Sequence, residues 1–166
     1  NNYLSTELTI VNSDTFDLSI TYSCTGSYWA IRSKEILEGP FSCRIKVITI
    51  DPSNSGSTWY YGIGIIKADS TKEADYYYDS AILMSPGNHN GKYQGSEGGK
   101  LFNTCWKNED TIYMKRDEFN NLHFAVNDED DFKLTHNGVD GRMRIVFGFM
   151  HSVRIGKFQL EELING

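Results

Sequence analysis

The residues of this 166-residue chain most able to do chemistry are its histidines and cysteines, and neither set has the spacing of a reactive centre. The histidines are scattered, at His89, His123, His136 and His151. No C-x-x-C pair of the kind that holds zinc occurs among the cysteines, which are Cys24, Cys43 and Cys105. A catalytic nucleophile needs a base beside it, and the chain has no G-x-S-x-G segment to activate a serine. We therefore expect no catalytic residue, no metal ion and no cofactor.

Acidic side chains gather in expected turns instead of lining one face of a strand. The densest run is Asp128–Asp131, which lacks the glycine and the terminal glutamate of an EF-hand calcium loop. A glycosidase on a sandwich fold would place two carboxylates on one strand face, two or four residues apart. We interpret the acidic run as a solvated turn and expect the chain not to be an enzyme.

Charge and cysteine count narrow the partners and the compartment. The net charge of −6 argues against a nucleic acid or an anionic membrane as partner, because both attract basic surfaces. No stretch approaches the roughly 20 apolar residues of a membrane span. The odd number of cysteines is typical of a reducing compartment. We therefore expect an intracellular, cytoplasmic protein in which the cysteines are small buried hydrophobes.

The elements that would position any site are strands, because apolar and polar residues alternate through much of the chain. The clearest strand is Phe41–Ile50, with Phe41, Cys43, Ile45 and Val47 on the core face. A turn over Glu118–Asn121 predicts a hairpin between two of the other strands. Further strands are expected at Leu8–Val11, Leu18–Tyr22, Trp59–Ile66, Thr111–Arg116, Leu122–Val126, Met143–Phe149 and Val153–Leu160, the last two as a pair.

Helical signal is nearly absent, with room for about one turn at Lys34–Leu37 and another at Thr71–Tyr77. The longest irregular stretch is the glycine-rich Ser85–Gly99, which is either a functional surface loop or merely mobile. The length fits one domain over residues 1–166, with a core from about 8 to 160, and is also compatible with excision from a longer chain. Many short strands separated by turns predict an all-β, antiparallel two-sheet sandwich.

The order of several segments resembles the SPRY/B30.2 family. A strand ending in an Arg-Ser pair is followed by a glycine turn and a long strand, then by a glycine-containing central strand. Later come a segment similar to the family's Gly-Asp-Val-Ile and a "Leu-x-Phe-x-x-Asn" strand. In the Gly-Asp-Val-Ile segment, Glu109 replaces the usual glycine. These segments are Trp29–Ser33, Ile36–Val47, Tyr61–Ile65, Asn108–Met114, Leu122–Asn127 and Ile145–Phe149.

This resemblance implies a bent sandwich of the concanavalin A-like type that acts as an adaptor for protein binding. It implies recognition of a short peptide or partner surface, as the substrate-recognition or scaffold part of a complex such as a ubiquitin ligase. The isolated domain would be monomeric. Members of the family bind through loops at one edge of the sandwich, and the matching positions are Arg32, Ser33, Lys34, Tyr77, Tyr78, Phe149, Met150 and His151. Tyrosine, methionine and arginine suit such contacts because they offer large area and forked donors.

Three other readings stay open. A carbohydrate-binding, lectin-like sandwich is the first alternative, because Trp106–Glu109 is similar to a galectin Trp-x-x-Glu segment. The histidine, asparagine and arginine strand that should precede that segment is missing. A lyase or hydrolase on a related sandwich would need a carboxylate pair facing one concave sheet. The last reading is a purely structural or oligomerising domain.

Overall fold

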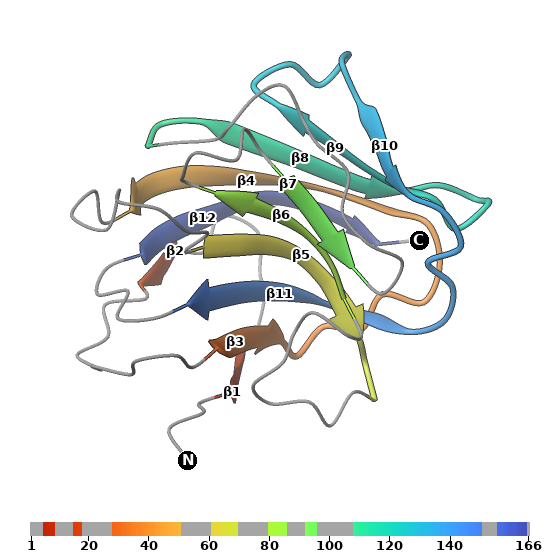
Figure 1. Ribbon diagram of the computed structural model, residues 1–166, viewed down its shortest axis with the longest axis horizontal. Coiled ribbons are helices and arrows are strands. Elements are labelled where there is room, and N and C mark those ends of the chain that lie inside the picture. The colour runs from red at the N-terminus through yellow and green to blue at the C-terminus, as the bar shows by residue number, and fades with distance from the viewer. Residues whose placement is uncertain are drawn as a thin grey trace.

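The chain folds into two facing six-stranded β-sheets, as the computed structural model shows (Figure 1). The structure describes residues 5–8, 15–17, 28–50, 61–69, 80–85, 92–95, 108–150 and 156–165. It describes side chains within residues 32–48, 63–69, 108–133, 136–147 and 158–165. All regular secondary structure in these ranges is strand, which confirms the all-β sandwich.

The strands alternate between the two sheets rather than filling one sheet before the other. The first sheet has the order β1 (Ser5–Leu8), β3 (Tyr28–Ser33), β11 (Met143–Met150), β5 (Tyr61–Lys67), β6 (Ser80–Ser85) and β7 (Lys92–Gly95). The second has the order β10 (Lys133–His136), β9 (Leu122–Val126), β8 (Thr111–Arg116), β4 (Phe41–Ile50), β12 (Gly156–Asn165) and β2 (Thr15–Asp17). Neighbours are antiparallel except β1 and β3, which run parallel.

The core lies between the sheets and follows from the period-two alternation. In β4, the predicted inward set of Phe41, Cys43, Ile45 and Val47 is at most 4% exposed, while the residues between them are half-buried. The rings of Phe147 in β11 and Phe158 in β12 join the two sheets, with centroids 5.2 Å apart. Each large side chain buried here contributes about 1.5–3 kcal/mol of hydrophobic stabilisation.

Three predicted strands have the bounds that the sequence indicated. They are β4 at Phe41–Ile50, β8 at Thr111–Arg116 and β9 at Leu122–Val126. The antiparallel pairing of β8 with β9 confirms the predicted hairpin. Strong alternation bounded by polar turn residues explains this agreement, because both ends and the inward face are then specified.

Three other expectations are wrong. Lys34–Leu37 forms a bend, and Leu37 then makes an antiparallel bridge to Met143 instead of a helical turn. The stretch Ser85–Gly99 is not irregular throughout, because β7 lies inside it and pairs with β6. The last two strands are not a pair: β11 belongs to the first sheet and β12 to the second.

The remaining predicted elements are described only in part. Strands are present at Ser5–Leu8 and Thr15–Asp17, each starting before the range predicted for it. The rest of Leu8–Val11 and all of Leu18–Tyr22 lie outside the described residues, as does Thr71–Tyr77. The central strand begins at Tyr61, and residues 59 and 60 are not described.

Candidate functional site

Arg116 is the organising side chain of one end of the sandwich. It closes β8, where Ile112 and Met114 also point inward, so the two-residue period carries an arginine into the interior. Its exposed fraction is only 2%. A guanidinium has five N–H donors in a fixed plane and no acceptor, so its burial requires a set of acceptors around it.

Backbone carbonyls supply those acceptors. The Arg116 Nε and Nη2 atoms donate to Gly39 O at 3.0 and 2.8 Å, and Nη2 also donates to Leu37 O at 3.0 Å. The Nη1 atom donates to Val139 O at 3.2 Å and to Gly141 O at 2.8 Å. One side chain therefore fixes the β3–β4 connection against the β10–β11 connection.

Burial lowers the pKa of the Arg116 guanidinium from its ordinary value, and the charge of nearby Asp140 opposes that shift by raising it. An arginine pKa starts so high that the group stays charged. The buried positive charge is therefore neutralised mainly by carbonyl dipoles rather than by a contacting carboxylate. The charge can therefore be buried only when the loops hold their carbonyl groups in these positions.

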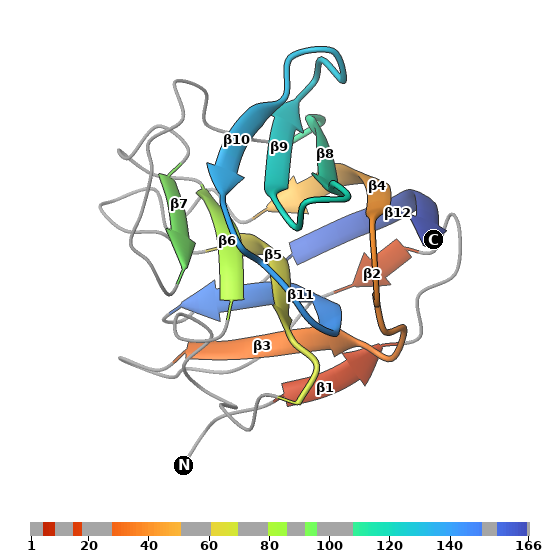
Figure 2. The same cartoon turned by 90° about the vertical axis from the view of Figure 1, so that its right-hand side faces the viewer.

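Backbone hydrogen bonds join two more loops to the same end. Ala68 N donates to Arg142 O at 2.9 Å, which ties the loop after β5 to the β10–β11 connection. Val139 N donates to Asn120 O at 2.7 Å, which ties the β8–β9 turn to it as well. We call the loops 34–40, 67–69, 117–121 and 137–142 together the Arg116 edge. Figure 2 looks toward this edge, where the β10–β11 connection passes from one sheet to the other.

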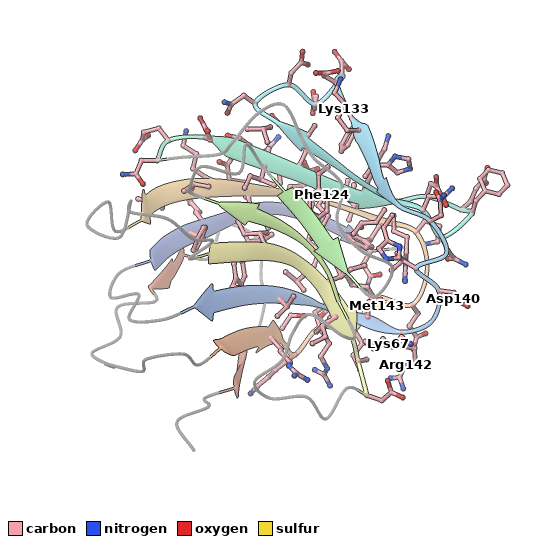
Figure 3. All side chains as sticks on the ribbon, viewed as in Figure 1. Lys67, Phe124, Lys133, Asp140, Arg142 and Met143 are labelled. Carbon is pink, nitrogen blue, oxygen red and sulfur yellow. The ribbon has the colours of Figure 1, made fainter. Side chains whose placement is uncertain are left out.

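A groove of about 560 Å³ lies in the Arg116 edge. Its lining combines a small apolar floor with charges of both signs: Ile36, Lys67, Ala68, Asp69, Asp140, Gly141, Arg142 and Arg144. Figure 3 shows Lys67, Asp140 and Arg142 at the same end of the sandwich. Lys67, Arg142 and both aspartates are exposed, so the groove can be reached from solvent.

The tip of the β8–β9 hairpin belongs to the same edge and carries the most exposed large apolar side chain among the described residues. Phe119 is 73% exposed. The Asp117 carboxylate accepts hydrogen bonds from Phe119 N and Asn121 N, each at 2.9 Å. The turn that displays the phenyl ring is therefore held from within.

The first group of predicted partner-binding residues lies at or beside the Arg116 edge. Arg32 and Ser33 are 7% and 2% exposed, whereas Lys34 is exposed. The Ser33 hydroxyl donates to Glu35 O at 2.8 Å and accepts from Ile145 N at 2.9 Å, so it serves the fold. Of the three, Lys34 offers its side chain to solvent.

The other predicted partner-binding residues do not all share that edge. In the antiparallel register of β3 and β11, Arg32 pairs with Val146 whereas Met150 pairs with Tyr28 at the far end of β3. Phe149 and Met150 belong to strand β11 rather than to a turn. The expectation that they join Arg32–Lys34 at one edge is wrong, because both strands run the length of the sheet between the two groups. Tyr77, Tyr78 and His151 lie outside the described residues.

The sequence did carry signals for the two residues that were missed. Arg116 follows Ile112 and Met114 at two-residue spacing, which places a charge on the core face next to a turn. A charged residue in that position needs local acceptors. Phe119 is the one aromatic residue within the predicted turn Glu118–Asn121, where an apolar ring has no strand face to bury it.

Other chemistry is limited within the described parts of the chain. There, no three histidine, cysteine, aspartate or glutamate side chains are grouped so that they could hold a metal ion. Burial raises the pKa of the Cys43 thiol to about 12, so this cysteine behaves as a small apolar core residue. A search of the described residues finds no helix with the length and apolar character to cross a bilayer.

Comparison with solved structures shows the same fold in SPRY domains. The SPRY domain of human HERC1 superimposes with a TM-score of 0.65 at 15% identity, covering 82% of this chain and 83% of that one. A second human SPRY domain gives 0.62 at 16% identity, covering 91% and 92%. The metal-free lectin I-B4 of Griffonia simplicifolia gives 0.52 at 10% identity, covering 88% and 85%.

Sequence comparisons add nothing to this likeness, since no family model and no curated protein matches the chain. At these low identities the structural similarity concerns the fold. The chain therefore has the SPRY-type, concanavalin A-like β-sandwich fold.

Proposed function

We propose that this chain is a non-catalytic protein-interaction module that binds a short peptide or a partner surface at the Arg116 edge. The observation that carries the proposal is the edge itself, in which a buried arginine and backbone hydrogen bonds hold four loops around an open groove. The SPRY-type fold agrees with such a role. The module would act inside the cell as a monomer, as the recognition or scaffold part of a complex such as a ubiquitin ligase.

Rigidity of the edge supports binding in a direct way. Loops that become ordered only on association reduce affinity by the entropy that they lose, and loops ordered beforehand avoid most of that cost. Here Leu37 and Met143 exchange two backbone hydrogen bonds of 2.8 and 2.9 Å, in addition to the bonds from Arg116. The groove of about 560 Å³ also falls within the usual size range of binding pockets.

Phe119 would act as the apolar anchor and the charged lining as the orienting rim. Aromatic residues at the centre of an interface commonly carry a large part of the binding energy. Lys67 and Arg142 can pair with carboxylates of a ligand, and Asp69 and Asp140 with its cations. Lys34 extends the same surface. A peptide containing both an apolar residue and charges of both signs would fit these groups.

A phage-displayed peptide library panned against the purified domain tests the proposal. Enriched peptides would be synthesised and their affinities measured by fluorescence polarisation. We expect Phe119→Ala and Arg142→Glu each to weaken binding about tenfold, as interface anchors do. Lys133→Glu makes the same charge change as Arg142→Glu but lies away from the edge (Figure 3), and it should leave the affinity unchanged. Absence of enriched peptides, or equal binding by all variants, would reject the proposal.

A carbohydrate-binding module is the second candidate, favoured by the shared fold with a lectin. Tryptophans are common partners of sugar rings, but Trp106 of the galectin-like segment lies outside the described residues. A glycan array separates the two functions. Saturable binding of a glycan that survives Phe119→Ala would favour the lectin function, and an empty array together with a peptide ligand would remove it.

A further inference from the structure

A second, smaller groove lies on the outer face of the second sheet, away from the core. It has a volume of about 220 Å³, which is room for about seven water molecules or one long side chain. Strands β4, β8 and β12 form its floor, and the connection between β9 and β10 forms one wall. The lining is Ser42, Cys43, Arg44, Tyr113, Lys115, Glu129, Asp130, Phe132 and Glu162.

Two aromatic rings meet in this groove. Tyr113 points outward from β8, and Phe132 comes from the β9–β10 connection; their ring centroids are 6.5 Å apart and their planes 77° apart. The Nζ atom of Lys115 stands 4.1 Å from the centroid of the Phe132 ring. That distance is well within the range in which a ring face attracts a cation. The groove already holds one cation against an aromatic face, supplied by the protein itself.

The charges around the rings favour a further cation. Arg44 is engaged by two glutamates, with Nε 3.1 Å from Glu161 and Nη1 3.6 Å from Glu162. Glu129 and Asp130 are exposed on the opposite wall, and within the described residues neither carboxylate is in an ion pair. Because Arg44 is paired with Glu161 and Glu162, Lys115 is the one remaining cation of the lining that can balance the Glu129 and Asp130 carboxylates. The lining therefore keeps a negative excess.

We propose that this groove binds an arginine side chain of a partner protein. The planar guanidinium would stack on Phe132 and direct its N–H groups to the Glu129 and Asp130 carboxylates, a combination that arginine makes better than lysine. Lys115 occupies the ring in the free protein, so it competes with the incoming cation and must swing aside. The chain's net charge of −6 would attract a basic partner to the protein.

This site is independent of the Arg116 edge. It lies on the outer face of the second sheet, and its lining shares no residue with the larger groove. Loss of peptide binding in the Phe119→Ala variant would therefore leave arginine binding unchanged. Neutralising Glu129 and Asp130 would conversely leave binding at the edge intact.

A nuclear magnetic resonance titration with the capped tripeptide acetyl-Gly-Arg-Gly-amide tests the proposal. We expect saturable shifts of the backbone amides of Tyr113, Lys115 and Phe132 at low ionic strength, weaker ones with the lysine tripeptide and none with the norleucine tripeptide. Equal effects of the norleucine tripeptide would show an apolar groove and overturn the proposal. Shifts spread over the whole surface without saturation would overturn it too.

Matched variants sharpen the result. The double variant Glu129→Gln with Asp130→Asn should weaken arginine binding about threefold or more, whereas Glu35→Gln with Glu118→Gln, an equal change in net charge at the Arg116 edge, should not. Phe132→Leu should weaken it about fivefold because the ring face is lost. All these residues are partly or fully exposed, so thermal unfolding should confirm intact folding.

Lys115→Met gives the most discriminating outcome. It removes the internal competitor and should tighten arginine binding by about threefold, while Lys92→Met, with the same loss of charge on the other sheet, should have little effect. If Lys115→Met instead weakens binding of the arginine tripeptide, the lysine belongs to the ligand contacts. The groove would then take a different class of ligand, and the proposal would be wrong.

Discussion

At each end of the β8–β9 hairpin, one Asp or Asn side chain accepts hydrogen bonds from backbone N–H groups, but the two ends differ in what they do. At the tip, the Asp117 carboxylate gathers the turn by accepting from Phe119 N, from Asn121 N and from the Asn121 side chain. The Nε2 atom of His123 stands 2.9 Å from the same carboxylate. The left-handed residue needed by the turn is Asn120, with φ of 62°, and asparagine tolerates that conformation well.

At the base, the Asn127 side chain makes the corresponding hydrogen bonds. Its Oδ1 accepts from Thr111 N at 2.8 Å, and its Nδ2 donates to the Asp110 carboxylate at 2.9 Å. Two residues here are left-handed, Asn127 with φ of 66° and Glu109 with φ of 74°. Glu109 N donates to Val47 O and Val47 N donates to Asp110 O, each at 2.8 Å, so the strained backbone is fixed to β4.

The two ends therefore differ in backbone conformation and in what they contact. The tip places Asn120, a residue suited to the left-handed region, in its turn and leaves Phe119 in solvent. It directly follows Arg116, which organises the loop edge. The base bonds its backbone to β4 and places a glutamate where a glycine would cost less. The tip is built to display a surface, and the base to hold strands together.

The largest change in stability is expected when the buried charge of Arg116, at the tip end of the hairpin, is removed. We expect Arg116→Met to lower the free energy of unfolding by about 3–5 kcal/mol, because carbonyls in the interior lose charged hydrogen-bond donors. Urea denaturation followed by circular dichroism measures the change. Arg116→Lys, which keeps the charge but offers fewer donors in a different shape, should fold and lose less. A loss below about 1 kcal/mol for Arg116→Met would mean that the edge does not depend on it.

Substitutions at the base should lower the free energy of unfolding less. Two substitutions of Asn127 separate the contribution of its side-chain hydrogen bonds from that of backbone strain. Asn127→Gly keeps the left-handed backbone and removes both side-chain hydrogen bonds, so we expect a cost of about 2 kcal/mol. Asn127→Ala also forces a β-carbon into the left-handed region and should cost about 1 kcal/mol more. Chemical denaturation of both variants gives the comparison. Equal losses for glycine and alanine would show that backbone strain at this residue is negligible.

The sequence predicted the hairpin because its information is local. Alternation of apolar and polar residues specifies the inward face of Thr111–Arg116 and Leu122–Val126, and the polar turn between them specifies their pairing. The resemblance also marked the base: Glu109 stands where the family has glycine, and the structure shows the positive φ that explains this glycine. In the same way, Asn127 of the "Leu-x-Phe-x-x-Asn" strand is the residue that closes the base.

The edge could not be assembled from the sequence, because its partners are distant along the chain. Arg116 is 77 residues from Gly39 and 79 from Leu37. Alternation tells which face of a strand is buried but not which strand lies beside it. This is why β11 and β12 were expected to pair, and why Phe149 and Met150 were placed with Arg32 although β11 carries them to the other end.

The tip should also show a characteristic dependence on pH. Hydrogen bonding to His123, chiefly, and to backbone amides lowers the pKa of Asp117 from 3.8 to about 2. Because the folded protein favours the charged carboxylate, its stabilising contribution is complete above pH 3.8 and is lost as the pH falls toward 2. We expect Asp117→Ala to cost about 1–2 kcal/mol at pH 7, similar to loss of a capping side chain.

The matched variant Asp117→Asn cannot titrate. The stability difference between the wild type and Asp117→Asn should therefore shrink as the pH falls from about 4 to 2. Thermal unfolding at a series of pH values measures it. His123→Gln should move the shrinkage to higher pH, since the main cause of the lowered pKa is then weakened. A difference that does not vary with pH would contradict the role of the charged carboxylate.

The smallest effect, and the one with the opposite sign, is expected at the base. Glu109→Gly should raise the free energy of unfolding by about 0.5 kcal/mol. Relief of the left-handed strain of a glutamate, roughly 1–2 kcal/mol, exceeds the entropic cost of the extra flexibility that glycine gives the unfolded chain.

The 3.8 Å ion pair between Lys46 and Glu109 is lost in this variant, but the Glu109 side chain is 77% exposed and such pairs contribute little. The bond from Lys46 Nζ to Glu109 O, 2.6 Å long, uses the backbone and remains. Lys46→Met serves as the control, because it removes both the ion pair and the hydrogen bond to Glu109 O without relieving the strain, and it should lower stability slightly. If Glu109→Gly were destabilising while Lys46→Met had no effect, the positive φ at residue 109 would carry no strain, and the contrast with Asn120 at the tip would be lost.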